Sequence, residues 1–246
     1  MALSSNSIIH FTDSLEKLLG ILQQGFIVKY CRETFSLKGE EETLHVPMVS
    51  FCDIPFSQIK NHIDSYGCYG VGLSKDWAIR NRLNPVLYVQ DESNLARSYY
   101  ALMTFLHSKE TAGEIDKVPR RLGIDIVRYI KNYEGMLTRK GMEPVRYRFS
   151  DEREWRYVPE IVDGEHPVYT SDDFDDATAK AANESLRDLT LTFEPGDISY
   201  IVIARDEEIK RVAALLNEKN YDAYTVSQAQ RLMTRIITNE QIQGDF

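Results

Sequence analysis

The sequence predicts an α+β protein, and two observations lead to that class. Short apolar runs of β-strand type recur along the whole chain. Amphipathic runs of helical type lie among them without the regular βαβ alternation of a doubly wound sheet. The 246 residues, 43% of them hydrophobic, suffice for a large buried core, and 14 Tyr and 10 Phe argue against disorder. No domain boundary is firm, so we expect one domain over residues 1–246.

The first predicted helix spans residues 14–24. Asp13 and Glu16 have the spacing of a capping box, and Gly25 is placed to end the helix. The apolar face carries four leucines at helical spacing, namely Leu15, Leu18, Leu19 and Leu22. We expect this face to pack against the sheet.

Strands and short helices follow in the first third of the chain. Pro55 suits the first turn of a helix that runs through Ile63. Ser74 suits the N-cap of a further helix that carries Trp77 and Ile79. The predicted strands are Phe26–Val28, Met48–Cys52, Tyr69–Leu73 and Pro85–Val89.

Helical periodicity dominates the middle of the chain and returns near its end. It predicts a helical insertion at about residues 93–140, with a break near Gly113 and Pro119. An acidic segment occupies about residues 163–190. The remaining predicted elements are strands at Val145–Phe149, Glu154–Val162 and Ile198–Ala204 and helices at residues 176–188 and Asp206–Lys219.

The charge is unevenly distributed around a formal total of −9. Residues 117–150 carry a net charge of +6, and residues 151–200 carry −10. The basic block could attract phosphates or a nucleic-acid backbone. The alternative is a solvated surface that pairs with the acidic segment beside it. The acidic total argues against a protein that coats DNA.

The sequence lacks the motifs of several enzyme classes. It has no P-loop, no GxGxxG dinucleotide motif and no GxSxG nucleophile elbow. Its five histidines are scattered without zinc-ligand spacing, so we expect no metal. Cys31, Cys52 and Cys68 fit free thiols in a reducing cytoplasm. We expect neither a signal peptide nor a membrane span, because no apolar run approaches ~20 residues.

Two candidate functional clusters lie in the first 74 residues. His10 and Thr12 end a short apolar run, although a lone histidine at a strand end is more often structural. Tyr66 and Tyr69 lie in the glycine-rich segment Ser65–Ser74 and can form a stacking wall for a flat ring. The alternative for this segment is a tight turn with aromatic residues of the core.

The third cluster is Asp151–Arg156. If it opens a strand, alternation places Glu152, Glu154 and Arg156 on one face. Two carboxylates along a strand can divide labour, one stabilising developing positive charge and the other handling a proton. The alternative is a solvent-exposed charged edge, with Arg153 and Arg156 as simple partners.

Together the three clusters resemble the motif pattern of ADP-ribosyltransferases. The resemblance implies a mixed-sheet core of that type over residues 8 to about 163, completed by the strand Ile198–Ala204. It also implies NAD as a substrate and a protein or nucleic-acid acceptor, without a metal. The implied site residues are His10 and Thr12 for NAD binding, Tyr66 or Tyr69 for the nicotinamide wall, Glu154 for catalysis and Glu152 for the acceptor.

A resemblance to the AbiGi proteins of bacterial abortive infection covers more of the chain. Residues 8–26, 46–89 and 149–159 carry it. Those phage-resistance proteins are regarded as the antitoxin-side partner of a nucleotidyltransferase-like toxin. The resemblance implies a bacterial defence role and leaves open whether the chain is an enzyme. We expect phage defence through transfer of ADP-ribose from NAD. The alternative is a non-catalytic antitoxin that binds and neutralises a toxin protein.

Overall fold

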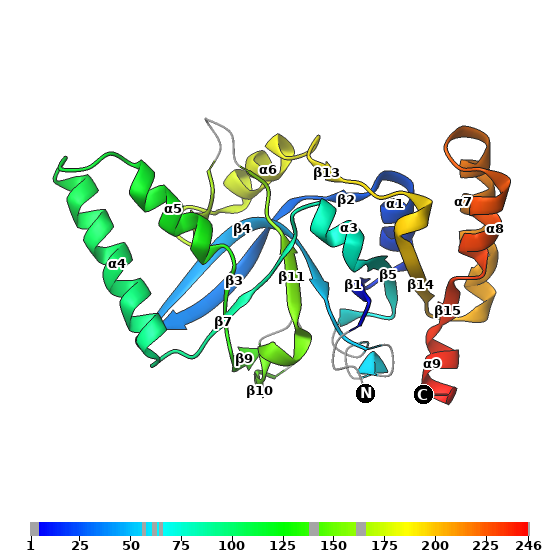
Figure 1. The fold of residues 1–246 in the computed structure, drawn as a ribbon, viewed down its shortest axis with the longest axis horizontal. Helices are drawn as coiled ribbons and strands as arrows, with labels where there is room; N and C mark the ends of the chain where they lie inside the picture. Colours follow the sequence, from blue (N-terminus) through cyan, green and yellow to red (C-terminus); the bar gives the residue numbers. More distant parts are fainter. Residues whose placement is uncertain are drawn as a thin grey trace. The chain divides into compact units, whose positions relative to one another are not determined.

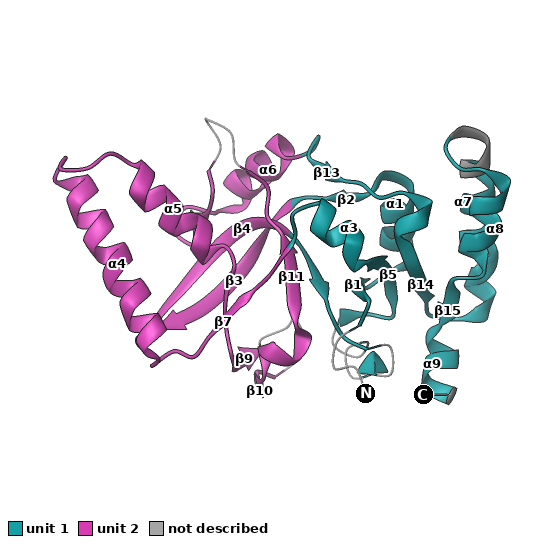
Figure 2. Ribbon diagram, in the orientation of Figure 1, with its two compact units in different colours: residues 1–28, 49–83, 187–246 teal, residues 29–48, 84–186 magenta. Residues whose placement is uncertain are grey.

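The structure is a computed structural model that describes residues 5–55, 58–60, 63, 66–137, 143–160 and 166–245. The chain divides into two compact units, and each contains both strands and helices (Figure 2). The first unit is formed by residues 1–28, 49–83 and 187–246, and the second by residues 29–48 and 84–186. The predicted α+β class is confirmed.

A mixed sheet forms the centre of the first unit (Figure 1). Its central strand pairing aligns Ile9 with Gly72 in antiparallel register. Ile9 also pairs with Cys52, the last residue of a long strand that begins in the second unit. The strands of this sheet that lie in the first unit are, in spatial order, β15 (Ile236–Thr238), β14 (Ile198–Ile203), β5 (Tyr69–Ser74), β1 (Ser7–Thr12) and the end of β4 (Glu40–Cys52). Only β14 and β15 are parallel, so the sheet is mixed.

Helix α1 (Leu15–Gln24) confirms the first predicted helix and differs from the prediction at its start. Ser14 is the N-cap, and its side chain accepts from the backbone N–H of Lys17. Asp13 forms an ion pair with the Lys17 side chain instead. Gly25 ends the helix with a φ of 86°, a conformation that favours glycine. Leu15, Leu18 and Leu22 are buried, as the leucine pattern predicts.

The other elements of the first unit complete its surface and its core. Ser74 is the N-cap of α3, as predicted. Trp77 on this helix is buried, whereas Ile79 is exposed. The proposed helix after Pro55 lies partly outside the described residues. The elements are α3 (Lys75–Arg80), β2 (Phe26–Ile27) with β13 (Thr190–Leu191), α7 (Ile209–Asp222), α8 (Val226–Met233) and α9 (Asn239–Asp245).

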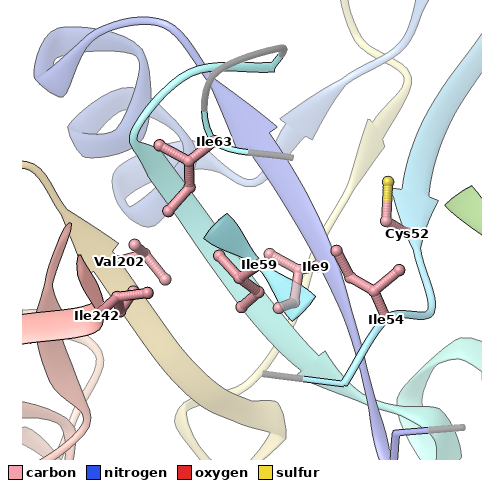
Figure 3. Close-up of a cluster of buried hydrophobic side chains, with 7 residues drawn as sticks. All are labelled: Ile9, Cys52, Ile54, Ile59, Ile63, Val202 and Ile242. Carbon is pink, nitrogen blue, oxygen red and sulfur yellow. The ribbon is translucent and has the colours of Figure 1, made fainter. Parts of the chain in front are cut away.

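The core of the first unit contains an aliphatic cluster drawn from distant parts of the sequence. Figure 3 shows its side chains, which come from strands, connecting segments and the last helix. Burying each large aliphatic side chain contributes about 1.5–3 kcal/mol. The cluster consists of Ile9, Cys52, Ile54, Ile59, Ile63, Val202 and Ile242.

The second unit is built around a long hairpin. β3 (Lys29–Leu37) pairs along its whole length with β4, and Lys38 and Gly39 turn the chain with φ values of 62° and 77°. Positive φ at both positions suits a two-residue hairpin turn. The sequence prediction missed β3 and the first half of β4, because charged residues alternate there with few large apolar ones. The short strand β12 (Tyr169–Thr170) adds to β4.

Three further strand pairs complete the second unit. They are β6 (Asn84–Pro85) with β11 (Glu154–Tyr157), β7 (Leu87–Val89) with β8 (Ile130–Asn132), and β9 (Gly135–Leu137) with β10 (Val145–Tyr147). The predicted strand Pro85–Val89 is therefore split in two. The predicted strand after Val145 ends at Tyr147, because a 3₁₀ turn follows, η2 (Phe149–Glu152).

The predicted helical insertion is helical up to Val127. It consists of α4 (Asn94–Thr111) and α5 (Val118–Val127), with the predicted break between them. Beyond α5, the chain forms β8 and β9 rather than helix. The acidic segment contains α6 (Asp176–Ser185), as expected. Among the helices the structure describes, none is long and apolar enough to cross a membrane.

Candidate functional site

A buried group of charged side chains lies in the second unit, and we call it the ionic cluster. Four elements supply its members: β3, β8, η2 and β11. The members are Glu33, Lys131, Glu152, Glu154 and Arg156. Buried charges are stable only when paired and hydrogen-bonded, so the arrangement of partners decides what the cluster can do.

Arg156 is the centre of the ionic cluster and is fully buried. Its Nε donates to Glu154 Oε1 at 2.6 Å, and one terminal nitrogen donates to the Glu33 carboxylate. The other terminal nitrogen donates to the backbone carbonyl of Arg128 at 2.9 Å. The guanidinium thus ties β11 to β3 and to the end of α5.

Lys131 joins the two carboxylates that the sequence pattern singles out. Its Nζ lies 2.7 Å from Glu154 Oε2 and 3.1 Å from Glu152 Oε2. The backbone N–H of Glu154 donates to the Tyr88 hydroxyl at 2.8 Å. Both oxygens of Glu154 therefore have cationic partners, and its side chain is only 4% exposed.

The two carboxylates have pKa values displaced in opposite directions. Burial alone would raise the pKa of Glu154, but the charges of Arg156 and Lys131 outweigh it and hold this pKa well below its usual range. Burial, together with the charges of Glu154 and Glu33, raises the pKa of Glu152 to about 9. At neutral pH, Glu152 therefore carries a proton. Two carboxylates then face two cations, so the ionic cluster is electrically neutral.

The predicted strand face is confirmed in part. Glu154 and Arg156 share the buried face of β11, while Trp155 and Tyr157 on the other face are half-buried. Glu152 lies in η2, not on the strand, and Arg153 turns the chain between them with a φ of 46°. The alternative of a solvent-exposed charged edge is wrong, because Glu154 and Arg156 are buried.

Lys131 and Glu33 are the partners that sequence reasoning missed. Glu33 lies in a strand that was not predicted, and Lys131 lies in a strand that was expected to be helix. Position within a strand, rather than residue type, brings both to the cluster.

The candidate NAD-binding residues lie in the first unit, and His10 is among aromatic side chains there. Its ring packs edge-to-face with Phe26 and Phe51, at centroid distances of 5.1 and 5.7 Å. Nδ1 lies 2.8 Å from the Ser50 carbonyl oxygen and donates to it. Burial lowers the pKa of His10 more than this hydrogen bond raises it, so the ring is neutral at pH 7. These contacts fit the structural alternative for a lone histidine.

Thr12 and Tyr69 are brought together as direct partners across β1 and β5. The Tyr69 hydroxyl donates to Glu208 Oε1 at 2.8 Å, and burial with this carboxylate raises the pKa of Tyr69 to about 12. Tyr66 is half-buried. It precedes Gly67, whose φ of 104° and position against the Thr12 carbonyl leave no room for a side chain.

Packing within the protein accounts for the glycines of β5. A Cβ at Gly72 would lie 3.0 Å from Cδ2 of Tyr200, and one at Gly70 would lie 3.1 Å from the His10 carbonyl oxygen. These glycines therefore admit a neighbouring strand and the Tyr200 ring. The alternative of a tight turn with aromatic core residues is met in part, because Gly67 turns the chain before β5, whereas Tyr66 and Tyr69 are only half-buried.

Of the seven basic side chains that the structure describes in the block 117–150, five have an acidic partner within the second unit. Arg121 and Arg128 pair with Asp125 at 3.5 and 3.0 Å, and Arg146 pairs with Glu134 at 2.5 Å. Arg120 lies 3.5 Å from Glu110, and Lys131 belongs to the ionic cluster. These partners favour a paired surface over a nucleic-acid site. Of these five side chains, only Lys131 has its acidic partners within residues 151–200, so the expected pairing with the acidic stretch is confirmed in part.

The described residues contain no group of three or more His, Cys, Asp or Glu side chains that could hold a metal ion. Cys31, Cys52 and Cys68 are free thiols, as the sequence predicts.

Comparison with known proteins decides the family. Residues 24–204 match the family described as "Putative abortive phage resistance protein AbiGi, antitoxin". The chain belongs to the AbiGi family. Abortive phage resistance protein AbiGi from Lactococcus lactis subsp. cremoris is 25% identical over 224 residues, which cover 82% of this chain and 89% of the relative. No solved structure matches. The resemblance to AbiGi is confirmed, and the link to ADP-ribosyltransferases stays a prediction.

Proposed function

We propose that this AbiGi chain is an antitoxin that neutralises a toxin by binding it, as one half of a phage-defence pair. The family description supports the antitoxin role and implies a toxin partner. The resemblance in the sequence gives that partner a nucleotidyltransferase-like chemistry. Protection then depends on contact between two proteins.

The observation that carries this proposal is the state of Glu154. A catalytic carboxylate must reach the ribose of NAD and stabilise the positive charge that develops in the transition state. Both oxygens of Glu154 are held within the chain, one by Arg156 and the other by Lys131. A neutralised carboxylate with 4% exposure suits a structural role.

The proposal is tested by expressing the nucleotidyltransferase-like toxin with and without this chain. We expect growth to be restored when the chain is present and the two purified proteins to elute together from a sizing column. The chain alone should release no nicotinamide from NAD. Glu152→Gln, which imitates the protonated side chain, should neutralise the toxin as well as the parent does. Restored growth without any complex between the two proteins would contradict the proposal.

A second candidate is ADP-ribosyl transfer from NAD, and the opposed pKa values of Glu152 and Glu154 favour it. Such divergence is typical of acid–base pairs. The bond between ribose and nicotinamide would break with its electron pair passing to nicotinamide. The acceptor would attack the same carbon and release a proton. With a pKa of about 9, Glu152 accepts that proton only when the pH is high enough to ionise it.

This candidate has its own test in nicotinamide release between pH 6 and 10. Release should rise toward pH 9 and fall by ~100-fold or more in Glu154→Gln, the loss expected when one electrostatic contact to the transition state disappears. His10→Ala should weaken NAD binding, measured by calorimetry, while leaving the fold intact. Absence of NAD binding by the parent at millimolar concentration would reject the candidate and leave the antitoxin proposal standing.

A further inference from the structure

The helix pair α4–α5 of the second unit has one face turned toward the hairpin β3–β4. Tyr99 of α4 donates through its hydroxyl to the Gly123 carbonyl of α5 at 2.5 Å, and a Cβ at Gly123 would collide with Met103. Ala96 and Val127 are buried in a core cluster with residues of β3. These contacts fix which sides of both helices point inward.

Another side of each helix carries exposed apolar residues. On α4, the exposed positions 95, 98, 102 and 105 follow the i, i+3, i+7, i+10 spacing of a helix–helix seam. On α5, positions 118, 122 and 126 are four residues apart and lie on one face. We call this surface the outer face, and it consists of Leu95, Leu102, Phe105, Val118, Leu122 and Ile126.

Each of these six side chains is between 48% and 60% exposed. Isolated apolar residues on a surface are ordinary, but three exposed apolar residues aligned on each of two neighbouring helices indicate an interaction surface. α4 and α5 run beside each other (Figure 1).

The spacing along α4 is self-complementary about residue 100. Leu95 and Phe105 are equally far from this position, and so are Ser98 and Leu102. An antiparallel second copy of α4, related by a two-fold axis at this point, would place Leu95 against its Phe105 and Ser98 against its Leu102. A two-fold interface requires this kind of self-complementarity.

The charges at the two ends of the stripe follow the same symmetry. Glu92 lies one turn before Leu95, and Lys109 lies one turn after Phe105, with its Nζ 5.8 Å from the Phe105 ring centroid. In the antiparallel arrangement, Glu92 of one copy lies beside Lys109 of the other. Opposite charges meet at both ends, whereas a parallel arrangement would bring like charges together.

We propose that the outer face is a two-fold interface with a second copy of this chain, in which the two α4 helices pack antiparallel and the two α5 helices flank them. Four helices packed in this way bury the exposed stripes of both helix types. The interface is independent of the proposed toxin binding.

The proposal is tested with the full chain by sedimentation equilibrium over a range of concentrations. We expect the parent to dimerise and Leu102→Glu to weaken dimerisation at least about tenfold, because a charge would be buried at the centre of the interface. Ile79→Glu is the matched control, since Ile79 is 65% exposed on α3 of the first unit, and it should leave the dimer unchanged. Circular dichroism checks that each variant is folded.

A charge exchange tests the antiparallel arrangement. Glu92→Lys and Lys109→Glu should each weaken the dimer a few-fold, and the double variant should restore it. Within one chain, Glu92 pairs with Arg97 at 3.0 Å and Lys109 with Glu114 at 2.6 Å. The double variant restores neither of these pairs, so recovery can come only from contacts between copies.

Three results would overturn the proposal. They are a parent that stays monomeric at every concentration, a dimer that Leu102→Glu leaves intact, and a double variant no better than either single one. Toxin binding that Leu102→Glu abolishes in a chain that is monomeric by itself would assign the outer face to the toxin and overturn it as well.

Discussion

Each unit contains a buried apolar cluster, and the second unit also buries a network of charged side chains. The aliphatic cluster of the first unit is apolar throughout, and five of its seven members are isoleucine. The interior of the second unit holds the ionic cluster, with Arg156 fully buried among carboxylates. An aliphatic cluster requires matched volume, whereas each member of an ionic cluster requires one particular partner. The comparison therefore predicts that the second unit is the more sensitive to single changes and to pH.

The largest effect is expected from Glu154→Gln. This change removes the negative charge that faces both Arg156 and Lys131 and leaves two buried cations facing one ionised carboxylate. Breaking a buried pair in this way typically costs 3–5 kcal/mol, so we expect a loss of about that size in urea unfolding at pH 7. A loss below about 1 kcal/mol would mean that the cluster is solvated and would remove the contrast between the units.

The corresponding change in the first unit is Leu18→Ala. Leu18 is fully buried on the face of α1 that packs on the sheet. Truncating a buried leucine costs about 2–5 kcal/mol through lost burial and the remaining cavity. Because no charge is involved, the difference from the parent should be the same at pH 5 and pH 8. Gln23→Ala, at an exposed position of the same helix, is the control and should change the free energy of unfolding by less than about 0.5 kcal/mol.

The pH dependence of the free energy of unfolding of Glu152→Gln tests the expected pH sensitivity of the second unit. The folded pKa of Glu152 is about 9, whereas an unfolded glutamate titrates near 4.3. Between these values the folded state binds the extra proton, so its contribution to stability falls as the pH rises from about 4.3 toward 9. Glutamine has no proton to lose, so the variant should become progressively more stable than the parent over that range, by at most ~1.4 kcal/mol per pH unit. A constant difference across pH 5–8 would mean that the folded pKa of Glu152 is not raised above about 5.

The sequence predicted the fold where side-chain pattern alone determines structure. The leucine stripe of α1, the Ser74 cap and the apolar run of β14 are local signals, and all three are confirmed. The hairpin β3–β4 was missed because the chain pairs there through its backbone, with exposed charged residues alternating along it. No boundary between the units could be found, because residues 29–48 and 84–186 interrupt the first unit in the sequence.

Only the members of the candidate site that lie on β11 could be predicted from the sequence. Alternation placed Glu154 and Arg156 on one face, but nothing local indicated that Glu33 and Lys131 would neutralise them. The carboxylate pattern by itself therefore suggested catalysis. The partners, which come from 123 and 23 residues away in the sequence, suggest a structural role.

The smallest expected effect tests the start of α1, where sequence and structure disagree. The capping-box spacing predicts Asp13 as the N-cap residue. In the structure the N-cap is Ser14, and Asp13 forms an ion pair with Lys17 on the surface. Losing an N-cap side chain costs about 1 kcal/mol, because a backbone N–H loses its partner. An exposed i, i+4 ion pair contributes only about 0.3–0.5 kcal/mol. Ser14→Ala should therefore destabilise the protein about twice as much as Asp13→Ala in urea unfolding, and only the second effect should shrink in high salt. If Asp13→Ala destabilised the protein more than Ser14→Ala, Asp13 would be the N-cap and the helix would begin one residue earlier.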